Sequence, residues 1–409
     1  HFEKMLYDNA QLMTLYSNAY KEFKNPLFKS TVYQTFYFLK KRMRNTKGAF
    51  YAAIDADNNQ GEGRYYVFST EEIKKIAGND LALLQDFYRI DLEHPFEESF
   101  HHLRQTDNLG GFLKKHAISS NQLNQKRDAW EVQFETLKCQ REFPLVDTKI
   151  ITSWNALMIS GLVSAYEAFG DTVFLNQAKK AFTFLSKNMI QKGFLMHTYQ
   201  AKQAKMEANL EDYAFTIQAA LDLYQNTGTS AYLNLANELI QNTIKNFKTD
   251  KNPFFSFTKN PVLFTEIISI DDNVIASANA IMAKNLRTMG QLLNIEDFNS
   301  KAKKMLDRIS TYFKDGRSGN YCQWAQLIAK EAYSSKEIVI IGKEAQDLNK
   351  ELQQHYLPNI LFQISEKASE LPLLINRFFE KKTLIYVCEK KVCKQPVKTV
   401  EEALMLLKN

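Results

Sequence analysis

The chain has 409 residues, of which 45% are hydrophobic and 12% aromatic, enough for a large globular core. Its net charge of +6 is mild for this length, and the longest basic run, Lys40-Lys41-Arg42-Met43-Arg44, carries no nucleic-acid-binding signature, so we expect no nucleic-acid partner. No apolar run approaches the roughly 20 residues of a membrane-spanning helix, and 4 cysteines are too few for a disulfide framework, so we expect no membrane partner and a reducing, cytoplasmic location.

The first residues already carry a helical pattern. The opening His1-Phe2-Glu3-Lys4-Met5 has no initiator Met, no signal peptide and no polar lead-in, which predicts a fragment of a longer protein. Apolar side chains then recur on one helical face over residues 5–23, and the pattern repeats over 28–44. Two β-prone runs, 48–54 and 64–68, flank an acidic turn that contains glycine, and together they predict a β-hairpin.

Helical periodicity dominates the next part of the chain. We predict helices near 119–138, 153–169, 171–189, 212–226, 229–247, 274–290, 294–313 and 319–330. Short loops join many of them in pairs, and the pairs repeat every ~60 residues, longer than ordinary solenoid repeats. This pattern favours a closed (α/α)6 toroid of helical hairpins, with an open superhelix as the alternative. We therefore predict a mainly α fold, in which residues 1–332 form a toroid that lacks its first helices.

The pattern changes after the last of these helices. Apolar strands predicted at 337–341, 360–364 and 383–387 alternate with helices at 344–355 and 400–407. We therefore expect residues 333–409 to form a small C-terminal α/β unit with parallel strands. The single Gly342 after the first strand falls far short of a dinucleotide-binding fingerprint, and we expect no cofactor.

Cys388 and Cys393 lie at the end of the last predicted strand. Their spacing is not the two-residue gap of redox or zinc pairs, and no second pair exists, so we expect no metal site. Two reduced, partly buried thiols are the favoured state, with a disulfide across a turn as the alternative.

Six ordered motifs carry a family resemblance. They are His1 to Asp8; Asp55-Ala56-Asp57 with Gly61-Glu62-Gly63 and Tyr65-Tyr66-Val67; Arg141, Pro144, Asp147 and Lys149 with Ser153 to Ile159; Leu210 to Ala214; Asp272-Asn273 with Ser277 and Asn279; and Tyr386-Val387-Cys388 with Cys393 and Pro396. In this order and spacing, the chain closely resembles the thioredoxin-domain-containing family related to the spermatogenesis-associated proteins. The resemblance covers almost the whole chain and implies a six-hairpin, glycosidase-like toroid that follows a thioredoxin-like domain absent here. The chain departs from the family at Ala276 and Ala278, where the family usually has Pro and Gly.

The pair Glu211-Asp212, followed by Tyr213, is the first candidate site. The starts of the inner helices of a toroid surround a pocket mouth, where carboxylates can act as general acid or base, so Asp212 and Glu211 are candidate catalytic residues and Tyr213 a substrate-binding one. Alternatively, one of the acids caps the helix. The site hypothesis predicts that Asp212→Asn weakens ligand binding and leaves the fold nearly intact.

A second candidate group lies at the start of the chain. Glu3 and Tyr7, expected four residues apart on one helix, share a face and suit sugar hydroxyls. Glu3 is therefore a candidate catalytic acid, while His1, Tyr7 and Asp8 are candidate substrate-binding residues. The alternative for Glu3 and Tyr7 is a buried, hydrogen-bonded pair that joins two helices.

Asp57 and Glu62 lie in the acidic loop 55–62. The spacing of its first acidic residues resembles an EF-hand, but Gln60 stands where Gly is needed and Tyr66 where a bidentate Glu is needed. We therefore expect an acidic hairpin over the pocket mouth, with Asp57 and Glu62 facing the ligand. A solvated turn is the alternative.

Four further residues complete the predicted substrate-binding set: Trp154, Asn155, Asp272 and Asn279. Trp154 opens an apolar helix, where its indole suits the apolar face of a sugar or, alternatively, the core. Arg141 could bind a carboxylate or phosphate, but an ion pair with Asp147 is favoured.

Two hypotheses for the function follow from the toroid and its acids. The leading one is a carbohydrate-active protein, a hydrolase or an epimerase-like enzyme, with a pocket lined by acids and aromatics. The alternative is a non-catalytic toroid that binds a protein client or a glycan for the absent thioredoxin-like domain. In a third hypothesis, the toroid is a scaffold whose acids only cap helices.

Overall fold

The computed structural model describes residues 2–191, 193–247, 252–259, 266–315, 318–333 and 335–408. The chain forms two compact units. One, the inserted unit, consists of His1–Met5 and Ala53–Asp147, and the other, the hairpin unit, consists of Leu6–Ala52 and Thr148–Asn409. The two units do not meet near residue 333, where the sequence predicts a domain boundary, so a separate C-terminal domain stays a prediction.

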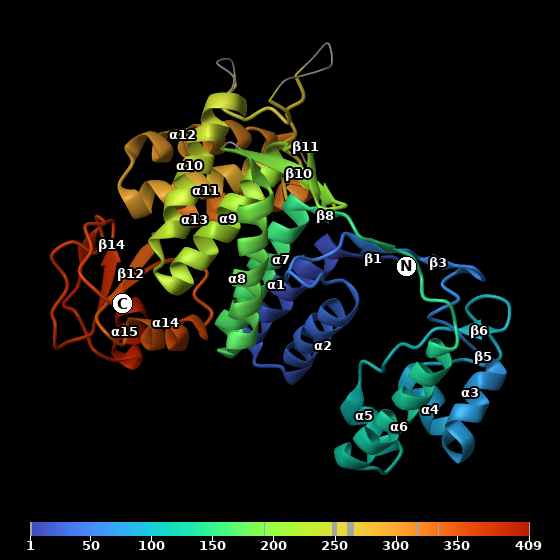
Figure 1. Ribbon diagram of the computed structural model, residues 1–409. Helices are drawn as coiled ribbons and strands as arrows, with labels where there is room; N and C mark the ends of the chain where they lie inside the picture. The colour runs from blue at the N-terminus through green and yellow to red at the C-terminus, as the bar shows by residue number, and fades with distance from the viewer. Residues whose placement is uncertain are drawn as a thin grey trace. The chain divides into compact units, whose positions relative to one another are not determined.

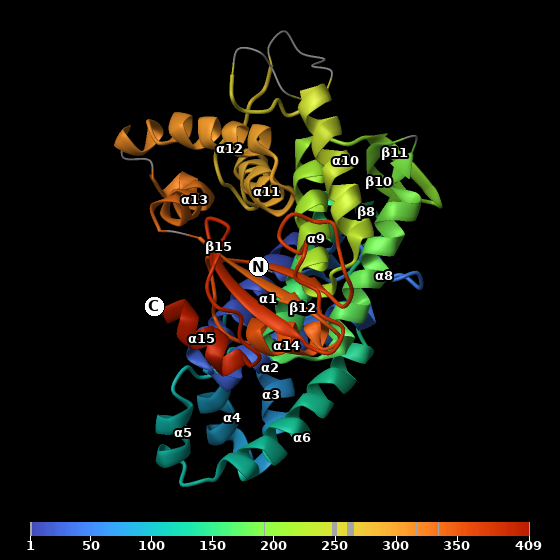
Figure 2. The same cartoon turned by 90° about the vertical axis from the view of Figure 1, so that its left-hand side faces the viewer.

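The hairpin unit is built from two layers of helices (Figures 1 and 2). Its inner layer, in which each helix packs against the next, comprises α1 (Leu6–Phe23), α7 (Thr152–Phe169), α9 (Leu210–Thr227), α11 (Ala278–Leu293) and α13 (Cys322–Ala332). Its outer layer comprises α2 (Pro26–Arg42), α8 (Thr172–Asn188), α10 (Ser230–Phe247) and α12 (Glu296–Ile309), each packed on the inner helix before it. Most residues of α7 and α9 are buried, as expected for helices that are apolar on nearly every face. The mainly α fold and its (α/α)6 toroid class are therefore confirmed, and the described residues contain four hairpins of it.

Short loops close the hairpins where the sequence predicts them. Gly170, Gly228 and Asn294 end the inner helices α7, α9 and α11 in the left-handed conformation, with φ of 65°, 63° and 57°. At Gly228 a side chain is also excluded by space, since an added Cβ would lie 2.6 Å from the carbonyl oxygen of Ile364.

Short strands accompany the hairpins. β8 (Ile150–Ile151) precedes α7, and β9 (Ile190–Gln191), β10 (Phe194–Gln200) and β11 (Gln203–Glu207) lie between α8 and α9. β10 pairs antiparallel with β8, β9 and β11, and it carries His197.

The C-terminal sheet has the strand order β13-β12-β14-β15. Its elements are β12 (Lys336–Ile341), α14 (Ala345–Gln353), β13 (Ile360–Ser365), β14 (Leu384–Glu389), β15 (Val392–Cys393) and α15 (Val400–Lys408). β12 and β13 are parallel, but β12 and β14 are antiparallel, so the predicted all-parallel unit is wrong. No helix crosses over between β13 and β14, and a parallel strand needs such a crossover. Buried bonds dock the sheet on α9, where Gln363 Nε2 donates to the Tyr224 hydroxyl at 2.7 Å.

Cys388 and Cys393 form a disulfide, so the prediction of two reduced thiols is wrong. The two residues are directly opposite each other on the antiparallel strands β14 and β15. The turn between the strands brings the sulfur atoms together, an outcome that sequence spacing alone did not favour.

The inserted unit combines small sheets with helices. Its strands are β1 (Lys4–Met5), β2 (Ala53–Ile54), β3 (Asp57–Asn58), β4 (Gly61–Glu62), β5 (Phe68–Ser69), β6 (Phe100–His101) and β7 (Val146–Asp147). Its α-helices are α3 (Thr70–Ala77), α4 (Leu81–Tyr88), α5 (Leu109–Lys115) and α6 (Ser120–Cys139), which share an apolar core. The predicted hairpin of 48–54 with 64–68 is wrong, because β2 pairs with β1 and β7 while the acidic loop forms its own hairpin, β3–β4.

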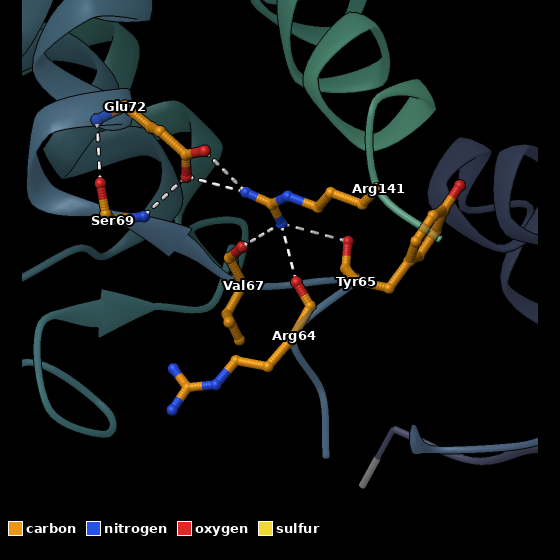
Figure 3. Close-up of polar contacts among 6 residues, drawn as sticks. All are labelled: Arg64, Tyr65, Val67, Ser69, Glu72 and Arg141. Atoms are coloured by element: carbon orange, nitrogen blue, oxygen red, sulfur yellow. Dashed lines mark hydrogen bonds and ion pairs between the residues drawn. The ribbon is translucent and has the colours of Figure 1, made fainter. Parts of the chain in front are cut away.

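Arg141 holds the inserted unit together (Figure 3). Its guanidinium donates to both carboxylate oxygens of Glu72, at 2.9 and 2.8 Å, and to the carbonyl oxygens of Arg64, Tyr65 and Val67. Glu72 also accepts from the backbone N–H of Ser69 in the capping box of α3. Arg141 is thus a structural residue, as expected, but its partner is Glu72 and not the predicted Asp147.

Candidate functional site

Side-chain contacts bring the first turns of the inner helices together at one end of the hairpin unit. Tyr7 of α1 and Trp154 of α7 form an edge-to-face pair with ring centroids 4.8 Å apart. The backbone N–H of Ser153 in α7 donates to Asp212 Oδ1 of α9 at 3.0 Å. The starts of α1, α7 and α9 therefore lie side by side.

The segment before α11 completes this arrangement. Gln11 of α1 donates through Nε2 to the carbonyl oxygen of Val274 at 2.9 Å. Leu210, the first residue of α9, donates through its backbone N–H to the carbonyl oxygen of Phe257 at 2.9 Å. The helix starts thus surround one end of the hairpin unit, as the toroid hypothesis predicts.

A cavity of about 130 Å³ opens between the starts of α9 and α11. Glu211 lines it from α9, and Asp271, Asn273 and Ser277 line it from the segment that leads into α11. This volume lies below the roughly 300–1,000 Å³ of typical small-molecule sites, so a larger ligand would extend from it into solvent.

Glu211 is the distinctive group of this cavity. It is partly buried, and its carboxylate makes no hydrogen bond to any residue in the described part of the chain. Burial raises the pKa of the Glu211 carboxyl, and the neighbouring charge of Asp212 raises it further, whereas His197 acts in the opposite direction. An unpaired acid with a raised pKa in a cavity is suited to proton transfer.

Asp212, in contrast, is fully paired. It is completely buried, and its carboxylate accepts from Ser153 N–H, from Asn209 N–H at 3.0 Å and from His197 Nδ1 at 2.8 Å. Together with Asn209 it forms the capping box of α9. Asp212 therefore joins α7, α9 and β10, which is the helix-capping alternative, and it also positions a histidine.

His197 was not singled out by the sequence. Its bond to Asp212 raises the pKa of the imidazole, and burial opposes the rise. Nδ1 carries the proton toward the carboxylate, since an ionised carboxylate can only accept. Nε2 makes no hydrogen bond to any residue that the structure describes, and the side chain is 25% exposed. The sequence offered one signal for this role, a His on a short predicted strand that precedes the pair Glu211-Asp212.

Asp272 has the same structural role as Asp212, one hairpin further along the chain: its carboxylate accepts from backbone N–H groups at two helix starts. Its Oδ1 accepts from Ser277 N–H and its Oδ2 from Gln323 N–H, both at 2.8 Å. It thereby ties together the starts of α11 and α13. Its neighbour Asp271 is exposed and lines the cavity, although the sequence singled out only Asp272.

Asn155 and Asn279 form matching clasps on α7 and α11. Each is fully buried, accepts at Oδ1 from the backbone N–H of a phenylalanine and donates from Nδ2 to the carbonyl oxygen of the same residue. The phenylalanines are Phe50 and Phe255, and the four distances are 2.8–3.0 Å. These bonds give both amide side chains a structural role, although Asn279 also lines the cavity.

The other predicted site residues are dispersed. Tyr213 is buried, and its hydroxyl accepts from Leu195 N–H at 3.2 Å. Asp8 is exposed in the first turn of α1, whereas Glu3 precedes β1, outside the helix, so the predicted helical pairing of Glu3 with Tyr7 is wrong. Asp57 and Glu62 are exposed cross-strand partners of β3–β4 in the inserted unit. His1 lies outside the described residues.

The described residues also set limits on other kinds of site. Within the described ranges, no three side chains of His, Cys, Asp or Glu lie together in a way that could hold a metal ion. Among the helices in those ranges, none has the length and apolarity to span a membrane.

Two layers of helical hairpins, with carboxylates gathered at the inner-helix starts, define a glycosidase-like toroid. Residues 103–317 match the family described as Beta-L-arabinofuranosidase, GH127 catalytic domain. This match covers more than half of the chain, and the chain belongs to that family.

Curated relatives match along nearly the whole chain. An uncharacterized protein of Caenorhabditis elegans is 28% identical over 98% of this chain and 60% of its own length. Spermatogenesis-associated protein 20 of Homo sapiens is 25% identical over 97% of this chain and 57% of its own length. The chain thus spans less than two thirds of the length of these relatives.

Among solved structures, a sugar epimerase from a ruminal bacterium aligns with a TM-score of 0.45 and 12% identity, over 75% of this chain and 61% of that one. Cellobiose 2-epimerase from Spirochaeta thermophila aligns with a TM-score of 0.45 and 11% identity, over 76% of this chain and 60% of that one.

Proposed function

We propose that the hairpin unit binds a carbohydrate at the starts of its inner helices and hydrolyses a glycosidic bond there. The observation that carries the proposal is Glu211, an acid with a raised pKa and no hydrogen-bond partner among the described residues, in the wall of a cavity. Membership in a glycoside hydrolase catalytic-domain family supports hydrolysis over epimerisation.

In this proposal, two carboxylates have separate catalytic roles. Glu211 is the general acid, because its raised pKa favours the protonated carboxyl over that of an ordinary glutamate, and it protonates the leaving-group oxygen. Asp271, exposed on the same cavity, is the second carboxylate and activates water or stabilises positive charge on the sugar ring. His197, oriented by Asp212, is a second proton-transfer group next to Glu211.

The aromatic pair Tyr7–Trp154 offers a surface for the apolar face of a sugar ring. Both side chains are only partly buried and lie at inner-helix starts beside α9. The substrate-binding roles of Asp8, Asp57 and Glu62, the catalytic role of Glu3 and the cytoplasmic location stay predictions. A thioredoxin-like domain and a protein client also stay predictions, based on the family resemblance.

The test compares Glu211→Gln with Glu207→Gln, a control at an exposed acid on β11. Thermal unfolding is measured against a panel of mono- and disaccharides, since a ligand at about 100 times its Kd stabilises by roughly 2.7 kcal/mol. Nitrophenyl glycosides, including β-L-arabinofuranoside, then report hydrolysis.

We expect a sugar-specific shift and turnover in the wild type and in Glu207→Gln, and loss of turnover in Glu211→Gln. Unchanged turnover in Glu211→Gln would remove Glu211 as the acid. A wild type that neither shifts nor hydrolyses any glycoside would contradict the proposal and favour a binding or scaffold role.

A further inference from the structure

The inserted unit holds a second and larger cavity, of about 420 Å³. This volume falls within the range of roughly 300–1,000 Å³ in which proteins bind small organic molecules. None of the predicted site residues lines it, and the proposed glycosidase chemistry does not use it.

Five of the side chains that line it are phenylalanine or tyrosine rings. Phe68, Tyr88 and Phe134 are buried, with 2%, 5% and 3% of their surface exposed, and they pack on one another at the floor. Phe2 and Tyr66 form a wall in which the two rings are nearly parallel, 5° apart in plane and 6.1 Å between centroids. The cavity therefore offers flat apolar surfaces to a ligand.

Lys4 supplies one positive charge beside these rings. Strand β1 places it opposite Ile54, and its Nζ lies 3.7 Å from the centroid of the Tyr66 ring, a cation–π contact. Nζ donates to the carbonyl oxygen of Phe2 at 2.5 Å and to no carboxylate among the described residues. The amine is thus half-buried without an anion to balance it.

The acidic side chains around the cavity are paired with cations other than Lys4. Glu135 forms an ion pair with Lys138 on the next turn of α6, and Glu131 lies 3.5 Å from Arg127. Both acids are exposed at the rim. The charge that remains inside is that of Lys4.

We propose that this cavity binds a small organic acid with a flat apolar body, whose carboxylate pairs with Lys4 and whose ring lies against Phe2, Tyr66 and the floor. The carboxylate replaces the missing counter-charge in a partly dry site, where a charge-assisted hydrogen bond is strong. A neutral molecule of the same shape gains the apolar contacts but leaves the ammonium uncompensated.

Binding of the acid is linked to a proton. Burial, and then the charge of Lys138, lower the pKa of Lys4 to about 8. A bound carboxylate favours the ammonium form, so affinity is highest below that pKa and falls as the pH rises through it. The other titratable groups that face the cavity are His102, Glu131, Glu135, Lys138 and Tyr88. Measurements start at about pH 7.5, above the range in which histidine side chains generally change charge.

The test is calorimetric titration of the full chain with benzoate and naphthoate, alongside the neutral benzamide and naphthamide. Lys4→Met removes the charge, Lys4→Arg keeps it, and Lys114→Met is a control at an exposed lysine of the same unit. We expect the acids to bind, Lys4→Met to weaken them by about tenfold or more, and the other two variants to bind within a few-fold of wild type. We also expect affinity to fall between about pH 7.5 and about pH 10 in the wild type and not in Lys4→Met.

Equal binding of the acids and the amides, or acid binding that Lys4→Met leaves unchanged, would overturn the proposal. Failure of the wild type to bind either acid at millimolar concentration would overturn it as well. Thermal unfolding of each variant confirms that the unit is folded. If Lys4→Met does not fold, Lys4→Arg carries the test, because arginine stays charged and its affinity for the acids should not fall between about pH 7.5 and about pH 10.

Discussion

The two cavities differ in size, in lining and in the sign of their unbalanced charge. The cavity of the hairpin unit is about 130 Å³, and its partly buried acid Glu211 makes no hydrogen bond within the described residues. The cavity of the inserted unit is about 420 Å³, is lined by aromatic rings and has one amine without an anion, Lys4. Beside each of these groups lies an acid that is already paired, Asp212 in the hairpin unit and Glu135 in the inserted unit. Charged groups that lack a partner thus mark where a ligand can act, while the paired ones hold the fold.

The largest effect is expected for Glu211→Gln, which should lower kcat for a cleaved glycoside by about 10²–10⁴ because general acid catalysis is lost. Its melting temperature should stay near that of the wild type, since Glu211 makes no hydrogen bond within the described chain. Binding of naphthoate in the inserted unit should also be unchanged. A matching loss of both activities would indicate global damage and would remove the contrast between the two cavities.

Phe134→Ala should have the largest effect on stability in the inserted unit. Phe134 is 3% exposed and packs against Phe68 at the cavity floor. Truncation of such a ring costs about 3–5 kcal/mol. Urea unfolding measures the loss, with Phe96→Ala as a control at an aromatic residue that is 53% exposed. Similar losses in the two variants would contradict the assignment of Phe134 to the core.

Asp212→Asn should cost about 2–3 kcal/mol, because two backbone N–H groups and His197 lose a charged acceptor. The sequence predicted a nearly intact fold for this variant, and its buried, paired carboxylate leads us to expect lower stability instead. The free energy of unfolding from chemical denaturation distinguishes the two expectations. A loss below about 0.5 kcal/mol, the range of ordinary surface changes, would show that the capping bonds contribute little.

The pair His197–Asp212 should add the smallest effect, a pH dependence of the stability. The pKa of His197 is raised in the folded state, so its contribution is fully present below the ordinary pKa of about 6.5 and is lost as the pH rises through the raised value. The difference in melting temperature between wild type and His197→Asn should therefore shrink as the pH increases above that value. A difference that grows over this range would mean that the imidazole is neutral in the fold.

Long helices were predictable, since their positions follow from local periodicity. The helix expected at 153–169 is α7, Thr152–Phe169, and its stop at Gly170 follows from a left-handed cap. The helices α3, α4 and α5 were missed, because 7 or 8 residues carry too little periodicity to identify.

Pairings between distant segments were not predictable from local pattern. Glu211 and Asp212 are adjacent and chemically alike. Bonds from Ser153, 59 residues away, and from His197 and Asn209 assign Asp212 to the fold and leave Glu211 without a hydrogen bond in the described chain. The partner of Arg141, 69 residues away, was missed for the same reason. The disulfide depended on the register of β14 and β15, which sequence spacing does not encode.

The matching clasps of Asn155 and Asn279 affect where the chain between hairpins can vary in length. The two helix starts read Ser153-Trp154-Asn155-Ala156-Leu157-Met158 and Ser277-Ala278-Asn279-Ala280-Ile281-Met282. Each clasp fixes the start of one hairpin to the segment that follows the outer helix of the hairpin before it, at 2.8–3.0 Å. Such a clasp can keep neighbouring hairpins aligned while the chain between its two partners is lengthened, as it is by the insertion of Ala53–Asp147 between Phe50 and α7.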